Sequence, residues 1–116
     1  MTIREISKLL DAKIYCGKEF LDRDVHTGVG CDLMSDVLAY VEDQAVLLTG
    51  LVNPQVIRTA EMMDIVCLVF VRGKEPTEAM IKLAEERNII LMSTDRGMFA
   101  ACGVLYHQGL KSGDDY

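Results

Sequence analysis

The sequence lacks a cluster of basic residues and a long apolar run. Twelve Lys and Arg stand against eighteen Asp and Glu, which gives a formal net charge of −6 at pH 7. Because binding to a phosphate backbone or an anionic membrane surface requires a local positive field, neither is expected as a partner. The longest apolar stretch, residues 65–71, is far shorter than the roughly 20 residues of a membrane helix. The start of the chain is mixed polar and acidic, unlike a signal peptide, so we expect a cytoplasmic protein.

Metal-binding and nucleotide-binding motifs are also missing. The cysteines, Cys16, Cys31, Cys67 and Cys102, are widely separated, whereas zinc and cluster sites normally show closely spaced ligands. We predict no metal and no cofactor, and interpret the cysteines as small apolar residues in a reducing compartment. Cys31 differs, because it lies beside a glycine turn where its thiol could be exposed. Neither G-x-G-x-x-G nor G-x-x-x-x-G-K-[ST] occurs, which excludes nucleotide sites of those types.

No pattern predicts a catalytic centre, so we predict no catalytic residues. Asp32 and Asp36 lie one helical turn apart and could share a divalent cation, although a solvated pair of like charges is the commoner arrangement. Cys31 would need a thiol pKa lowered by a helix N-terminus or a nearby cation. The G-x-S-x-G elbow of hydrolases is absent. An activity based on Cys31 or on the Asp32 and Asp36 pair is kept as a minority alternative.

The hydrophobic pattern predicts one compact domain in which strands and helices alternate with short connections. Half of the 116 residues are hydrophobic, enough for a single core. Helical periodicity or helix-capping residues indicate helices over residues 3–11, 32–41, 54–63, 76–88 and 98–107. Apolar runs indicate strands over residues 13–16, 25–30, 45–49, 65–71 and 89–92. We therefore predict a layered α/β domain over residues 1–108, with a mostly parallel sheet of about five strands and helices on both faces. Residues 109–116 are predicted to be a flexible tail.

Polar residues follow the predicted strands at four corners of the chain, over residues 28–32, 49–53, 72–74 and 93–96. Ligands of open α/β sheets bind at the carboxyl ends of the strands, beside the free amides of helix N-termini. The expected contacts to a small anionic or nucleotide-like ligand are Asp32, Ser35, Asn53, Arg72, Ser93 and Thr94. Arg72 would bind a carboxylate or phosphate. The structural alternative is that Asp32, Asn53 and Asp95 only cap helices and that Arg72 is solvated.

The segment Leu-Asp-Arg-Asp-Val-His-Thr-Gly at residues 21–28, followed by Cys-Asp-Leu-Met-Ser-Asp-Val at residues 31–37, resembles the DRTGG domain. The similarity extends from Ile3 to Tyr106, and the main departure is Val29, where a second glycine is usual. The resemblance implies an α/β domain similar to the N-terminal domain of HPr kinase, without the kinase half. DRTGG domains often lie beside CBS domains, in phosphotransacetylases and some inorganic pyrophosphatases, which implies a regulatory, ligand-sensing or dimer-forming role. Stand-alone relatives occur near hydrogenase or redox genes.

These observations predict a non-catalytic regulatory domain that acts as a homodimer and binds a small anionic or nucleotide-like ligand at the strand carboxyl ends. The alternative is a dimerisation or docking module for a redox or carbon-metabolism enzyme, with no ligand of its own. The abundance of Met, Leu and Val in a small domain favours some remaining apolar surface, which a twofold dimer commonly covers.

Overall fold

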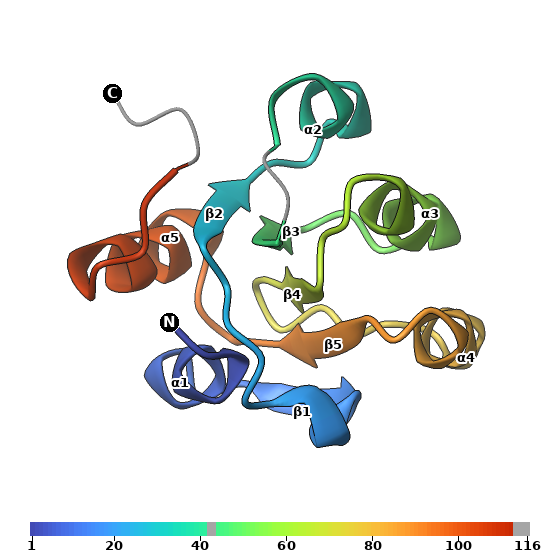
Figure 1. The fold of residues 1–116 in the computed structure, drawn as a ribbon, viewed down its shortest axis with the longest axis horizontal. Helices are drawn as coiled ribbons and strands as arrows, with labels where there is room; N and C mark the ends of the chain where they lie inside the picture. The colour runs from blue at the N-terminus through green and yellow to red at the C-terminus, as the bar shows by residue number, and fades with distance from the viewer. Residues whose placement is uncertain (42–43, 113–116) are drawn as a thin grey trace.

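The computed structural model describes residues 1–41 and 44–112 as a three-layered α/β domain (Figure 1). Its five-stranded sheet has the order β1-β5-β4-β3-β2. The strands are β1 (Lys13–Cys16), β2 (Thr27–Gly30), β3 (Ala45–Thr49), β4 (Cys67–Phe70) and β5 (Ile90–Ser93). The helices are α1 (Ile3–Leu9), the short 3-10 helix η1 (Lys18–Phe20), α2 (Met34–Tyr40), α3 (Pro54–Met62), α4 (Glu78–Glu86) and α5 (Met98–His107).

The sheet is mostly parallel, as predicted. β2, β3, β4 and β5 run parallel to one another, and β1 pairs with β5 in the antiparallel direction. The predicted bounds of β1, β3 and α5 are confirmed, whereas the predicted strand at 65–71 is shortened to β4. The parallel strands are joined by crossover helices, as this connection requires.

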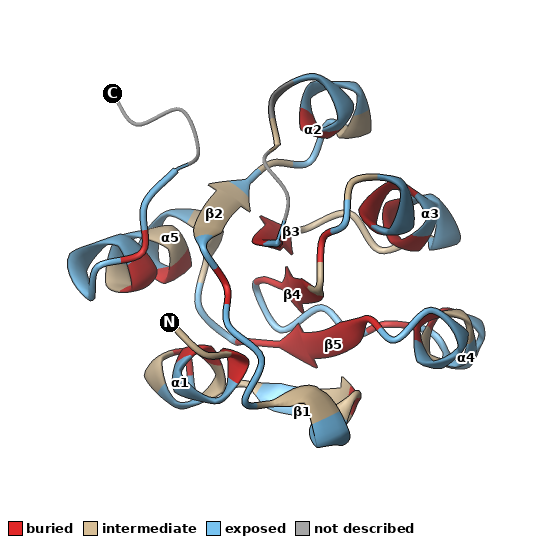
Figure 2. Ribbon diagram, in the orientation of Figure 1, coloured by how far each residue is buried: buried red, intermediate tan, exposed pale blue. Residues whose placement is uncertain are grey.

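Two apolar clusters hold the helices on the two faces of the sheet. α1 and α5 cover one face, and α2, α3 and α4 cover the other (Figure 1). Alternate residues of a strand enter opposite clusters: Val46 and Leu48 of β3 pack toward α1 and α5, and Leu47 packs toward α3. All residues of β3, β4 and β5 are buried (Figure 2). Strands covered on both faces explain the continuous apolar runs in the sequence.

Of the three predicted helix caps, Asn53 is confirmed, and Asp32 and Asp95 are wrong. Thr2 forms a capping box at α1, and Asn53 caps α3 with Pro54 at its first position. Asp32 does not cap α2, which begins after Leu33, because its carboxylate instead accepts hydrogen bonds from the loop after β3. Asp95 does not cap α5 either, because the helix begins later and Gly97 stands at its N-cap without a side-chain bond.

α5 buries only part of its apolar residues. Ala101 and Leu105 are buried, but Phe99 is 93% exposed and Tyr106 is 57% exposed. The helix packs closely on β2: a Cβ on Gly30 would lie 2.6 Å from Cys102 Sγ. This close approach turns the small residues of α5 toward the sheet and leaves its large aromatic residues outside.

The fold continues beyond the predicted boundary at residue 108. Leu110 is 6% exposed and packs in the cluster beneath α1 and α5. The amide of Gly28 donates to the Lys111 carbonyl at 2.9 Å, and Lys111 bridges Thr27 in the parallel direction. Residues 113–116 of the predicted tail lie outside the described residues. None of the described helices has the length and apolar character needed to span a membrane.

Candidate functional site

The ends of the four parallel strands lie at one edge of the sheet. Gly30 pairs with Leu48, Thr49 with Phe70, and Phe70 in turn with Ser93. The loops that follow these strands therefore meet at this edge, which we call the carboxyl rim: residues 31–35, 49–53, 71–75 and 93–97. The rim holds all six predicted ligand contacts, so the sequence placed them at a common edge of the fold.

Asp32 connects two of the rim loops. Its Oδ1 accepts a hydrogen bond from Thr49 Oγ1 at 3.0 Å and from the amide of Gly50 at 2.7 Å. The ammonium of Lys74 donates to the Gly50 carbonyl at 2.9 Å, and this bond connects the loop after β4 to the loop after β3. Ser35, on the first turn of α2, is exposed. Asp32 thus stabilises the rim through bonds within the chain.

Ser93 lies beside a group that the sequence analysis did not include. The hydroxyl of Tyr15 donates to Glu75 Oε1 at 2.7 Å and lies 3.0 Å from Ser93 Oγ. The hydrogen bond from Tyr15 and, next, the charge of Lys13 lower the pKa of Glu75, and burial is the main cause of a raised pKa at Tyr15. The signal for Tyr15 lay in the strand at 13–16, but only the antiparallel pairing of β1 with β5 places it at the rim.

Asn53 and Thr94 make side-chain hydrogen bonds within the fold. Asn53 Oδ1 accepts from the amide of Gln55 at 2.9 Å as the cap of α3. Thr94 is 2% exposed, and its hydroxyl donates to the Leu10 carbonyl at 2.7 Å and accepts from the amide of Arg96 at 3.3 Å. These bonds give both residues a structural role, whereas a role in ligand binding stays a prediction.

Arg72 is the one predicted contact with a positive charge. It is exposed and adopts a left-handed conformation with φ of 61°. Backbone bonds fix this turn, since the amide of Arg72 donates to the Arg96 carbonyl and that of Gly73 to the Thr94 carbonyl, both at 2.8 Å. A Cβ built on Gly97 would lie 3.9 Å from Arg72 Nε, so the guanidinium borders the N-terminus of α5. Lys74 and Arg96 are two further cationic residues of the rim, and both belong to the polar segments predicted at residues 72–74 and 93–96.

The four cysteines are free thiols that differ in burial. Burial raises the pKa of the Cys16, Cys67 and Cys102 thiols. Cys31 is half-buried, and its thiol donates to the Leu33 carbonyl at 3.4 Å. Within residues 1–41 and 44–112, no three His, Cys, Asp or Glu side chains gather closely enough to hold a metal ion.

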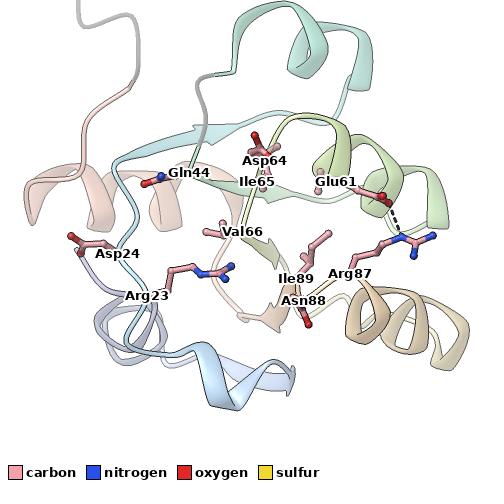
Figure 3. A pocket seen from close by; sticks show the side chains of 11 residues that line it. Arg23, Asp24, Gln44, Glu61, Asp64, Ile65, Val66, Arg87, Asn88 and Ile89 are labelled. Carbon is pink, nitrogen blue, oxygen red and sulfur yellow. Dashed lines mark hydrogen bonds and ion pairs between the residues drawn. The ribbon is translucent and has the colours of Figure 1, made fainter.

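Two cavities lie away from the six predicted contacts. The first, of about 540 Å³, lies at the amino ends of the parallel strands and is called the amino-end cavity (Figure 3). It is lined by Arg23, Asp24, Gln44, Ala60, Glu61, Asp64, Ile65, Val66, Arg87, Asn88 and Ile89. The second, of about 410 Å³, is called the α5 groove and lies between β2, α5 and the C-terminal segment. It includes Gly28, Val29, Gly30, Phe99 and Tyr106. The polar residues predicted from the sequence lie at the opposite ends of the strands, so they give no signal for the amino-end cavity.

The fold and the polar rim define a small layered α/β domain with helices on both faces of a mostly parallel sheet. The chain belongs to the DRTGG domain family, whose profile matches residues 5–107. Its fold is similar to the crystal structure of the CBS and DRTGG domains of the regulatory region of Clostridium perfringens pyrophosphatase, complexed with its activator diadenosine tetraphosphate. The TM-score is 0.72 at 16% identity, over 90% of this chain and 45% of that one, so this chain spans about half of that structure. No curated protein matches the chain. The resemblance seen in the sequence is confirmed at the level of the family.

The departure from the family pattern at Val29 lies in β2, where the sequence is Gly-Val-Gly. A Cβ on Gly28 would lie 2.8 Å from Leu110 Cδ2, and one on Gly30 would meet Cys102, so both glycines permit close packing toward α5. Val29 points to the opposite face and packs against the cluster beneath α2 and α3. The valine is accommodated because successive side chains of a strand alternate between faces.

Proposed function

We propose that the chain is a non-catalytic regulatory domain that binds a small anionic or nucleotide-like ligand at the carboxyl rim. The observation that carries this proposal is the position of Arg72 beside the N-terminus of α5. No side chain caps that helix, so its first amides are available to an anion, and the helix dipole favours negative charge there. A guanidinium beside such amides is a suitable receptor for phosphate or carboxylate.

The backbone around Arg72 supports a preformed site. Its turn is held by the two amide bonds to the loop after β5, and Gly97 leaves the space in front of the guanidinium open. Arg96 adds a second cation, and Asp95 adds an opposing charge, since a Cβ on Gly73 would lie 3.1 Å from Asp95 Oδ1. The site would therefore favour a ligand whose anionic group is compact enough to contact Arg72 without approaching Asp95.

The comparison supports the regulatory class of the proposal. The similar structure belongs to the regulatory region of a pyrophosphatase and was determined with a nucleotide activator. That protein contains CBS domains as well, so the ligand class of this chain is inferred from its own rim. The absence of a catalytic role is part of the same proposal, and it is supported by Asp32, whose carboxylate holds the rim loops together.

The experiment is a thermal-shift panel with inorganic phosphate, pyrophosphate, mononucleotides, dinucleoside polyphosphates and acyl phosphates. A ligand at 100 times its Kd should add about 2.7 kcal/mol to the free energy of unfolding. Arg72→Asn removes the guanidinium but keeps a residue that tolerates positive φ, and it should abolish the shift. The control is Arg58→Gln, an exposed arginine on α3. No shift with any compound, or an unchanged shift in Arg72→Asn, would refute the rim site.

Self-association is the second proposed function, and the α5 groove favours it. Phe99 is 93% exposed, and β2, which lines the groove, is the last strand of the sheet, whose edge is bonded to the Lys111 segment at Thr27 and Gly28. A second copy placed across a twofold axis would cover both surfaces. We expect light scattering to give the mass of a dimer and Phe99→Glu to give a folded monomer, whose thermal midpoint is lower only by the stabilisation that association supplied. A monomeric wild type would contradict this part.

Three finer expectations belong to the same proposal. Docking to a redox or carbon-metabolism enzyme would use the same apolar surface, and affinity capture with wild type and Phe99→Glu would test it.

A cytoplasmic location is supported by the four cysteines, all of which are free thiols. The similarity to the N-terminal domain of HPr kinase stays a prediction.

A further inference from the structure

The amino-end cavity has the architecture of a second binding site, at the end of the sheet opposite to the carboxyl rim. Ala60, Ile65 and Ile89 are buried in its floor, and Val66 is half-buried there. Exposed polar side chains surround this aliphatic floor. A volume of about 540 Å³ falls within the range of small-molecule sites.

The cavity walls are fixed by backbone bonds. The amide of Ile65 donates to the Ala60 carbonyl at 2.9 Å and that of Ile89 to the Ala84 carbonyl at 3.0 Å, which closes the ends of α3 and α4. The amide of Gln44 donates to the Asp64 carbonyl at 3.1 Å. These bonds hold the cavity in shape without using the side chains of Gln44, Asp64 or Asn88, so little ordering is required on binding.

Ion pairs occupy some of the charged side chains that line the cavity. Arg87 Nε lies 2.7 Å from Glu61 Oε2, and Asp24 Oδ1 lies 3.4 Å from the terminal amine. Among the described residues, this leaves Arg23 and Asp64 without an ion-pair partner. In Figure 3 the guanidinium of Arg23 points into the space that the lining side chains surround, and Arg87 points away from it. Arg23 Cζ also lies 5.0 Å from the centre of the Phe20 ring, a contact with the guanidinium face that does not use its N–H groups. The N–H groups of Arg23 and the carboxylate of Asp64 are therefore available to a ligand.

The charges exclude a simple anion or a metal ion as the best occupant. Two arginines and three carboxylates line the cavity, so its lining is not positive overall. The carbonyl ends of α3 and α4 point to the same region and favour a cation. No set of three metal-binding side chains lies within the described residues. The pattern fits a ligand with both a carboxylate and an ammonium group.

We propose that the amino-end cavity binds a small zwitterion with an aliphatic body, a free amino acid or a short peptide. Arg23 receives the carboxylate, and Asp64, at the C-terminal end of α3, receives the ammonium group. The aliphatic side chain lies on Ile65, Val66 and Ile89, and the amides of Gln44 and Asn88 complete the polar wall. This site is independent of the rim, so Arg72→Asn should leave it unchanged.

The test uses the full chain with leucine and the dipeptide leucyl-leucine, followed by calorimetry and by amide NMR shifts. N-acetyl-leucine and leucinamide each lack one charge and should bind at least about tenfold more weakly than the zwitterion. Tighter binding of leucine would identify a free amino acid as the source, and tighter binding of the dipeptide a peptide. The largest shifts should fall on the amides of Gln44, Asp64 and Asn88.

Two variants test the assigned groups. Arg23→Gln and Asp64→Asn should each weaken binding at least about tenfold. Asn suits the φ of 54° at Asp64, so the turn is kept. The matched controls are Arg58→Gln and Asp11→Asn, the latter an exposed aspartate with φ of 49° after α1. Thermal midpoints show whether each variant folds. The proposal is overturned if no zwitterion binds at millimolar concentration, if the blocked analogues bind equally well, or if folded Arg23→Gln and Asp64→Asn bind like wild type.

Discussion

The two ends of the parallel strands use their polar residues in different ways. At the carboxyl rim, the side chains of Asp32, Asn53 and Thr94 make hydrogen bonds to the chain itself. At the amino end, the backbone closes α3 and α4, and the side chains of Asp64 and Asn88 project from left-handed residues. At α3 the reason is chemical: the free amides at a helix N-terminus need acceptors, and Asn53 supplies one, whereas the carbonyls at the C-terminus are bonded by the following amides. Asp32 and Thr94 cap no helix, and their bonds instead join the rim to neighbouring segments of the chain.

This difference changes how polar residues should be interpreted. A Ser, Thr, Asp or Asn at a helix start is often consumed by capping, so its residue type alone says little about a ligand. An Asp or Asn after a helix is selected for its backbone conformation, and its side chain remains available. In this fold Asp64 and Asn88, which follow α3 and α4, therefore line the larger of the two cavities described above.

The largest expected effect comes from removing a rim hydroxyl that the fold uses. Thr94→Val should lower the free energy of unfolding by about 1–3 kcal/mol, because the Leu10 carbonyl loses its bond in a buried position. Thr59 on α3 is the matched control, since its hydroxyl is buried with no hydrogen-bond partner among the described residues. Thr59→Val should stay within about 0.5 kcal/mol of wild type or be more stable. Urea denaturation measures both, and equal losses would contradict the assigned bonds.

A smaller effect should separate the two kinds of helix end. Asn53→Ala removes the side-chain cap of α3 and should cost about 1 kcal/mol. Asn88→Gly removes a side chain but keeps a residue suited to the φ of 57° after α4, and should change stability by less than about 0.5 kcal/mol. Thermal unfolding compares the two variants. A larger loss in Asn88→Gly would mean that its side chain also holds the fold.

The sequence was sufficient to predict the α/β fold and to place the predicted contacts at the carboxyl rim. Apolar runs identify β3, β4 and β5, and Asn53 with Pro54 identifies the start of α3. The sequence could not place Tyr15 beside Ser93, because that contact depends on an antiparallel pairing between distant segments. It also could not show that Phe99 is exposed, because the orientation of α5 depends on the glycines of β2.

The smallest predicted effect concerns Glu75, a rim carboxylate bonded by Tyr15. Its pKa is lowered in the fold, so the contribution to stability is present at neutral pH and is lost as the pH falls below the ordinary value of 4.5 through the lowered pKa. Tyr15→Phe removes the bond that lowers the pKa most, and it should therefore reduce this acid-dependent loss. Lys13→Gln removes the weaker cause and should have a smaller effect in the same direction.

The measurement is the thermal midpoint across the acid range for wild type and both variants. Because Glu75 is exposed, the differences should be small and should shrink further in salt. Parallel curves for wild type and Tyr15→Phe would show that the rim bond has no energetic role, and the contrast between a bonded rim and an open amino end would then rest on Asp32, Asn53 and Thr94.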